Sequence, residues 1–178
     1  MDKIGQRVSS VKRKKIISVW ICMLLVLNVV CLTGCGAGKK WKDGKCTISI
    51  ECSSILDNME ALKETKKKFV PSDGWILKET EVSFKGGETA FDVLKQICGK
   101  KGIHMASRYT PLYKSYYVEG INQLYEFDCG KNSGWMYSVN GEYPNYGASS
   151  YNLKDGDKVE WRYTCNLGSD VGDKYEGK

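Results

Sequence analysis

Cysteine is the residue type with the most chemical options in this 178-residue chain, which has eight cysteines and one histidine. Cys35 ends the run Leu32-Thr33-Gly34-Cys35: an aliphatic residue, two small residues, then cysteine. This is the pattern of a bacterial lipobox, in which the cysteine thiol receives a diacylglycerol and cleavage leaves that cysteine at the N-terminus. The pattern therefore predicts lipidation of Cys35. The two acyl chains would anchor the protein stably to the membrane.

The segment before Cys35 has the order of an export signal. Basic residues ending at Lys15 precede an apolar run from Ile16 to Leu32, which is the secretory arrangement. The run is 17 residues long, the lower limit for a spanning helix, so an uncleaved membrane anchor is the alternative. We therefore expect a lipoprotein signal peptide at residues 1–34, and a lipidated cysteine with a short tether at residues 35–45. Either way the domain lies on the extracytoplasmic face of the cell membrane, because the basic residues stay inside.

The net charge of +6 belongs mainly to this signal. Residues 1–34 hold six basic residues and one acidic residue, which leaves a net charge of +1 for the rest of the chain. A nearly neutral domain offers no electrostatic argument for a nucleic-acid partner.

Five cysteines follow Cys35 and are disulfide candidates, and an exported domain favours bridges. An odd number leaves one thiol unpaired. Apolar and polar residues alternate over residues 46–52 as in a strand, which places Cys46 and Cys52 about 20 Å apart. A disulfide needs Cα atoms within about 7 Å, so these two cysteines cannot pair with each other. No zinc site is expected, because no C-x-x-C pair exists and His104 has no partner at ligand spacing. The five candidates are Cys46, Cys52, Cys98, Cys129 and Cys165.

No catalytic motif is present, so we expect a protein that is not an enzyme and has no cofactor. The sequence has no G-x-S-x-G, no P-loop, no dinucleotide fingerprint and no H-E-x-x-H.

Aromatic residues are the more informative feature. Tyrosine and tryptophan combine a flat apolar face with a hydrogen-bonding edge, as binding surfaces often require. They gather in two stretches, and about half should belong to the core. The ligand-binding residues predicted from them are Tyr116, Tyr117, Trp135, Tyr137, Tyr143 and Tyr146.

The elements that must position these residues include one clear helix. Apolar residues recur at helical spacing from Ala90 to Cys98, Thr89 and Asp92 form an N-terminal capping box, and Gly99 or Gly102 ends the helix. A short helix or a loop with a helical turn is expected within residues 55–69. Asn140-Gly141 predicts a hairpin returning through Glu142-Tyr143. Strands are predicted at residues 46–52, 75–84, 103–109, 116–121, 124–127, 135–139 and 158–165.

These elements predict an α+β fold, a β-grasp-like roll with one main helix packed on a mixed sheet. The first and last strands would lie parallel at its centre. Cys52 and Cys165 would then lie near the same end of adjacent strands, which predicts a bridge between them. The polar, glycine-rich end of the chain, residues 170–178, is expected to be a disordered tail.

Two motifs resemble a known family. Residues 133–141 (SGWMYSVNG) and 152–161 (NLKDGDKVEW) are similar to domain of unknown function 4430 (DUF4430), the transcobalamin-like C-terminal domain, and the resemblance covers residues 46–169. The family has a β-grasp-like fold, closes the cobalamin site in transcobalamin and intrinsic factor, and occurs in lipoproteins of Firmicutes. Relatives carry a cysteine near Ala148, and its absence here would leave one cysteine unpaired.

The resemblance implies one function and leaves a second open. The first is a non-catalytic, lipid-anchored binder of a small ligand such as cobalamin or another corrinoid, working beside an uptake transporter. The chain lacks the large helical domain of transcobalamin and the corrinoid lower-ligand motif D-x-H-x-x-G. The alternative is therefore a module that docks onto a surface protein or the cell wall and has no small-molecule ligand.

Overall fold

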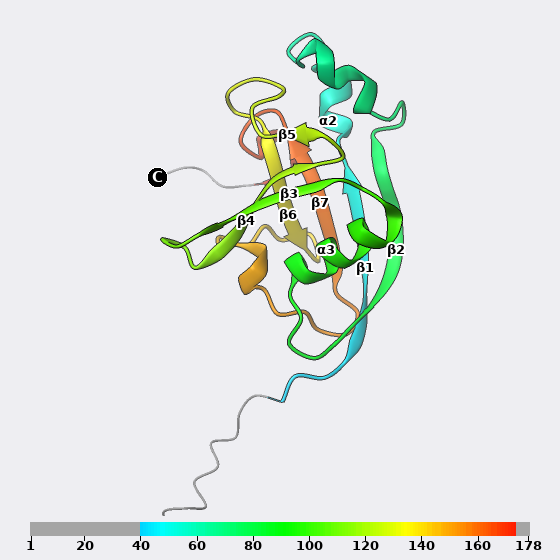
Figure 1. Cartoon of the computed structure of the whole chain (residues 1–178), viewed down its shortest axis with the longest axis vertical. Helices are drawn as coiled ribbons and strands as arrows, with labels where there is room; N and C mark the ends of the chain where they lie inside the picture. Colours follow the sequence, from blue (N-terminus) through cyan, green and yellow to red (C-terminus); the bar gives the residue numbers. More distant parts are fainter. Residues whose placement is uncertain (1–39, 174–178) are drawn as a thin grey trace, which may run out of the picture. The chain divides into compact units, whose positions relative to one another are not determined.

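Two parallel strands occupy the centre of the main sheet, as the sequence predicted. In a computed structural model that describes residues 40–173, β1 (Gly44–Glu51) runs parallel to β7 (Lys158–Thr164). The neighbours β2 (Trp75–Phe84) and β6 (Gly134–Val139) are antiparallel, which gives the order β2-β1-β7-β6 (Figure 1). The predicted α+β class with one main helix is confirmed.

The predicted signal peptide, Cys35 and residues 36–39 of the tether lie outside the described residues, as do residues 174–178. No helix within residues 40–173 is both long and apolar enough to cross a membrane.

The main helix, α3 (Ala90–Lys101), has the predicted caps. The hydroxyl of Thr89 accepts from the Asp92 backbone N–H at 3.2 Å, while the Asp92 carboxylate accepts from the Thr89 N–H at 2.9 Å. Gly102 ends the helix in the left-handed conformation, with φ 66°, which glycine adopts without a steric penalty.

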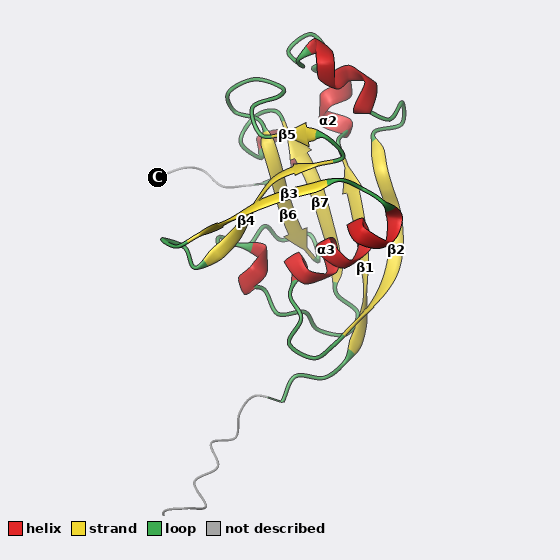
Figure 2. Ribbon diagram, in the orientation of Figure 1, coloured by secondary structure: helices red, strands yellow, loops and turns green. Residues whose placement is uncertain are grey.

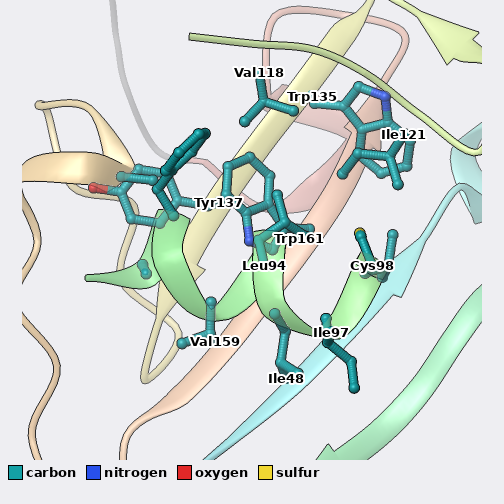
Figure 3. Close-up of a cluster of buried hydrophobic side chains, with 14 of the residues drawn as sticks. Ile48, Leu94, Ile97, Cys98, Val118, Ile121, Trp135, Tyr137, Val159 and Trp161 are labelled. Carbon is teal, nitrogen blue, oxygen red and sulfur yellow. The ribbon is translucent and has the colours of Figure 1, made fainter. Parts of the chain in front are cut away.

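The core lies between α3 and the main sheet (Figure 3). Leu94, Ile97 and Cys98 on the helix are buried, and so are Ile48 on β1 and Trp161 on β7. Period-two alternation of β7 explains this orientation, since every second side chain points to the same face of a sheet.

A second, smaller sheet was not predicted from the sequence. It consists of β3 (Met105–Thr110), β4 (Ser115–Ile121) and the two-residue strand β5 (Leu124–Tyr125), all antiparallel (Figure 2). The predicted strand over residues 124–127 is therefore too long. It stops at Tyr125 because Phe127 takes a positive φ of 63°, which is incompatible with a strand.

Two short helices follow β1, where the sequence predicted one short helix or a loop with a helical turn. They are α2 (Ser53–Leu56) and the 3-10 helix η1 (Glu64–Phe69). Lys66 in η1 forms an ion pair with the buried carboxylate of Asp128. Lys63, which directly precedes η1, pairs with the same carboxylate.

The Asn140-Gly141 turn forms, but the predicted return strand does not. Both turn residues have positive φ, 55° and 82°, as a type I′ hairpin turn requires. Only an isolated bridge between Val139 and Glu142 follows, because the strand that pairs with β6 is β7 and Pro144 has no N–H to extend a new ladder. A 3-10 helix, η2 (Ala148–Ser150), follows.

The start of the predicted disordered tail is instead ordered. Ser169–Val171 form a 3-10 helix, η3. The carboxylate of Asp170 accepts from the backbone N–H of Cys165 at 2.7 Å, and the carbonyl of Val171 accepts from the Tyr143 hydroxyl at 2.6 Å. These bonds fix a segment whose composition alone favours disorder.

Candidate functional site

The β3–β4 hairpin presents the most exposed apolar side chains of the described domain. At its tip, Leu112 is 81% exposed and Tyr113 is 73% exposed. Two backbone hydrogen bonds within residues 110–114 close the turn, and Lys114 adopts a positive φ of 47°. The hairpin therefore projects from the core as an apolar arm (Figure 1).

The base of this arm is fixed to η2. Ser115 and Ser149 share a hydroxyl–hydroxyl hydrogen bond of 2.8 Å, and the Ser149 hydroxyl also accepts from the Tyr116 N–H at 2.9 Å. Gly147 makes this approach feasible, because a Cβ there would lie 2.7 Å from the Ser115 Cβ. This contact joins segments 34 residues apart, and no local sequence pattern predicts it.

A groove opens between the arm and the segment leading into η2. We call it the tyrosine groove, and its volume is about 530 Å³, within the usual range of about 300–1,000 Å³ for small-molecule sites. Three tyrosines, Tyr116, Tyr117 and Tyr146, are between 39% and 49% exposed around it. Its full lining is Arg108, Thr110, Tyr113, Ser115, Tyr116, Tyr117, Pro144, Asn145, Tyr146 and Gly147.

A smaller hollow of about 170 Å³, the inner hollow, shares Tyr116, Tyr117 and Gly147 with the groove. Its wall includes Tyr137 and Trp161, whose rings stack with centroids 5.5 Å apart. The remaining wall consists of Val118, Trp135 and Ala148. The groove is therefore backed by rigid aromatic core rather than by mobile loop.

One cation and two carboxylates border the groove. The Arg108 guanidinium lies 3.0 Å from Glu119 and 3.8 Å from Glu126, and it sits over the ring of Tyr117 at 5.3 Å. The Tyr117 hydroxyl donates to Glu126 at 2.7 Å. Burial, together with this hydrogen bond, raises the pKa of Tyr117 to about 12, so the hydroxyl is protonated at neutral pH.

Another hollow, separate from the tyrosine groove and the inner hollow, lies between α3 and β3 and also borders Tyr116. Its volume is about 590 Å³. The Tyr116 ring stacks on Phe91 with centroids 4.8 Å apart, and both rings line this hollow. Two of its polar lining residues, Thr89 and Asp92, already bind each other in the capping box. The tyrosine groove is therefore the better ligand site, because its tyrosine rings and the Arg108 side chain remain partly exposed.

The six residues predicted to bind ligand fall into three groups. Tyr116, Tyr117 and Tyr146 lie in the tyrosine groove. Trp135 and Tyr137 line the inner hollow behind it. They are only 6% and 9% exposed, so they support the groove from the core and offer little surface to a ligand. Tyr143 lines a separate hollow of about 350 Å³ and binds Val171.

Arg108, Pro144 and Asn145 are groove residues that the sequence analysis missed. The aromatic clustering pointed to their neighbours, but nothing in the sequence distinguishes Arg108 from the other basic residues of the chain. Only the pairing of β3 with β4, which sets Arg108 opposite Tyr117, brings it to the site.

The five cysteines that were disulfide candidates are all free thiols in the structure. The predicted bridge between Cys52 and Cys165 is not formed. The Cys165 thiol instead contacts Cys129 and the Ser54 hydroxyl, because the end of β7 turns toward the loop between β5 and β6.

Within residues 40–173 no three His, Cys, Asp or Glu side chains are placed to hold a metal ion. His104 instead forms a 2.6 Å hydrogen bond with the Tyr125 hydroxyl.

Comparison with known proteins finds one family model that matches part of this domain. Residues 87–165 match the family model described as domain of unknown function (DUF4430), as the sequence motifs predicted. This match covers α3, both sheets apart from β1 and β2, and the whole tyrosine groove. No curated protein matches the chain.

One solved structure supports a shared fold. The crystal structure of haptocorrin in complex with Cbi is similar over 77% of this chain, with a TM-score of 0.50 and 17% sequence identity. The similar region is 29% of the haptocorrin chain, so this protein corresponds to less than a third of that relative. A "putative metal binding protein" from Ruminococcus gnavus ATCC 29149 matches 68% of this chain and 96% of its own, with a TM-score of 0.40 and 14% identity.

Proposed function

Starting from a chain whose residues 87–165 form a DUF4430 domain, we propose that the protein is a non-catalytic binder of a small ligand. The observation that carries this proposal is the tyrosine groove, where three half-exposed tyrosine rings and Arg108 surround a hollow of about 530 Å³. Stacked aromatic walls suit a flat or conjugated ligand, and the guanidinium suits an acceptor group on its rim.

A corrinoid such as cobalamin is the ligand we propose to test first. The shared fold with haptocorrin, whose structure holds Cbi, supports this choice. A groove of this size would contact one side of so large a molecule, leaving the opposite side for another protein. A transporter component beside the membrane would fill that role.

The test is equilibrium dialysis of the full chain against cobalamin, with bound vitamin measured by its visible absorbance. We expect saturable binding that weakens about tenfold in Tyr146→Ala, which removes one exposed wall of the groove. Leu112→Ala is the control, because this residue also has an exposed, large apolar side chain but lies outside the groove lining. Absence of binding at tens of micromolar vitamin would rule out the corrinoid ligand.

The projecting hairpin favours a second function, docking to a surface protein or the cell wall. Leu112, at the tip of the hairpin, is 81% exposed and lies outside the groove lining, so a binder of small ligands has no need of it. Under this alternative Leu112→Ala would weaken association with a partner in cell-surface pull-downs, whereas Tyr146→Ala would not.

We propose that the protein acts at the membrane, anchored through a diacylglycerol on Cys35. The lipobox and the preceding basic and apolar segments support this. Labelling cells with a tagged fatty acid tests it: the native chain should carry label, Cys35→Ser should not, and Cys31→Ser is the control. Equal labelling of all three chains would contradict anchoring at Cys35.

A further inference from the structure

The loop between β5 and β6 lies beside the segment that follows β7. In the antiparallel pairing of β6 with β7, Gly134 lies opposite Thr164. Beyond the ladder, the backbone N–H of Leu167 donates to the carbonyl of Asn132 at 3.0 Å. Cys129 and Cys165, 36 positions apart in sequence, are thereby brought to the same end of the sheet.

The two thiols rest on one short stretch of chain at α2. The Cys165 thiol contacts the Ser54 hydroxyl at 3.8 Å, and the Cys129 thiol contacts the Asn58 carbonyl at 3.5 Å. The Asn58 side chain donates to the Ser54 carbonyl at 2.8 Å, which holds these two contact points together.

The two thiols are also close enough to influence each other's pKa. Burial raises the pKa of both groups, and the neighbouring Cys129 thiol raises that of Cys165 further, to about 12. Neither thiol is therefore a reactive thiolate at neutral pH in the folded, reduced protein.

We propose that Cys129 and Cys165 form an intramolecular disulfide when the protein folds outside the cytoplasm. The proposal does not depend on the ligand. The oxidant is a disulfide, either of a thiol–disulfide oxidoreductase or of a small thiol such as glutathione. One cysteine thiolate attacks it to form a mixed disulfide and releases the first reduced thiol. The other cysteine thiolate then attacks the mixed disulfide, closes the bridge and releases the second.

Two protein thiols thus lose two protons and two electrons, and the oxidant disulfide becomes two thiols. The exchange has to precede complete burial, because the folded protein holds both groups protonated. The bridge closes a loop of 37 residues that contains β6, η2 and β7. Loop-closure entropy predicts a rise of about 650-fold in the folded-to-unfolded ratio.

Peptide mapping of the full chain tests the connectivity. The protein is folded with oxidised and reduced glutathione, alkylated in guanidinium and digested with trypsin without reduction. We expect the peptide of residues 115–131, which contains Cys129, to be joined to the peptide of residues 163–174, which contains Cys165. Two separately alkylated peptides, or a bridge from Cys165 to residues 46–63, which contain Cys52, would overturn the proposal.

Denaturation with and without reductant provides a second test. In the native chain, reductant should lower the urea midpoint. In Cys129→Ser and in Cys165→Ser this dependence should disappear. Cys98→Ser is the control, since Cys98 is also buried but lies on α3, and it should keep the dependence. An equal effect of reductant on native protein and Cys165→Ser would refute the bridge, and peptide mapping decides the question where a variant does not fold.

Discussion

Asp128 is a buried carboxylate whose charge should contribute measurably to stability. Its side chain is 3% exposed and accepts from the backbone N–H of Tyr125 at 2.8 Å. The ammonium groups of Lys63 and Lys66 lie 3.0 and 3.3 Å away. Together these bonds tie the start of the β5–β6 loop to the segment around η1, so we expect Asp128→Asn to destabilise the fold.

The magnitude follows from what asparagine retains. An amide oxygen still accepts from Tyr125, but the attraction to both lysines is lost. Lys63 is 59% exposed and regains water, whereas Lys66 is only 20% exposed and does not do so fully. Charge-assisted hydrogen bonds contribute about 1.5–3 kcal/mol each, and exposure reduces the Lys63 share, so we expect a loss of about 2 kcal/mol.

The pH dependence identifies the charge as the cause. Burial by itself would raise the pKa of Asp128, but the Tyr125 N–H and the two lysines outweigh it, and the pKa lies below its ordinary value. A carboxyl group with a lowered pKa in the folded state stabilises the protein above its unfolded pKa, about 3.9. This contribution disappears as the pH falls through the folded pKa. The difference in unfolding free energy between native protein and Asp128→Asn should therefore be at its maximum at pH 7. It should shrink as the pH falls below about 4.

Urea denaturation followed by tryptophan fluorescence, at neutral and at acid pH, measures this difference. Asp73→Asn is the matched control, because Asp73 also accepts from one backbone N–H and pairs with one lysine, but at an exposed position. It should leave the urea midpoint unchanged. Equal midpoints for native protein and Asp128→Asn at pH 7, or a difference that persists at acid pH, would refute the reasoning.

Three further substitutions probe the cap, the groove and the core. Thr89→Ala removes the capping hydroxyl of α3 and should cost about 1 kcal/mol in urea denaturation, with a loss below about 0.3 kcal/mol contradicting the cap. Gly147→Ala should cost about 1–3 kcal/mol and weaken ligand binding, because the new methyl group overlaps Ser115. Gly99→Ala, with open space at its Cβ, is the control and should stabilise α3 by about 0.5–1 kcal/mol. Tyr163→Phe deletes a buried hydroxyl that donates to the Tyr125 carbonyl at 2.7 Å, so thermal unfolding should show a loss of about 1–2 kcal/mol; an unchanged Tm would exclude that contribution.

Local patterns predicted most of the elements. The capping box of Thr89 and Asp92, the alternation of β7 and the positive-φ turn at Asn140-Gly141 depend on neighbours within a few residues. The sequence shows such neighbours directly. The 3-10 helix η3 was missed because it is held by side chains outside it, including Tyr143, which lies 28 residues from Val171.

Long-range pairing limited the prediction of the site. Aromatic composition pointed to Tyr116, Tyr117 and Tyr146, but not to a groove formed where they meet Arg108. The second sheet forms because β4 pairs with β3 and β5 and not with a strand of the main sheet. The hairpin arm is also held by the hydrogen bond between Ser115 and Ser149. No local pattern encodes that contact.

The sequence by itself determined the α+β class, the main helix with its caps, the central parallel strands and the DUF4430 motifs, because periodicity and turn chemistry are local. Only the tertiary structure decided which cysteine meets Cys165 and which tyrosines face solvent. Those outcomes depend on how loops after β5 and β7 fold back onto the sheet, and the backbone hydrogen bonds that direct them, such as that from Leu167 to Asn132, join residues far apart in the chain.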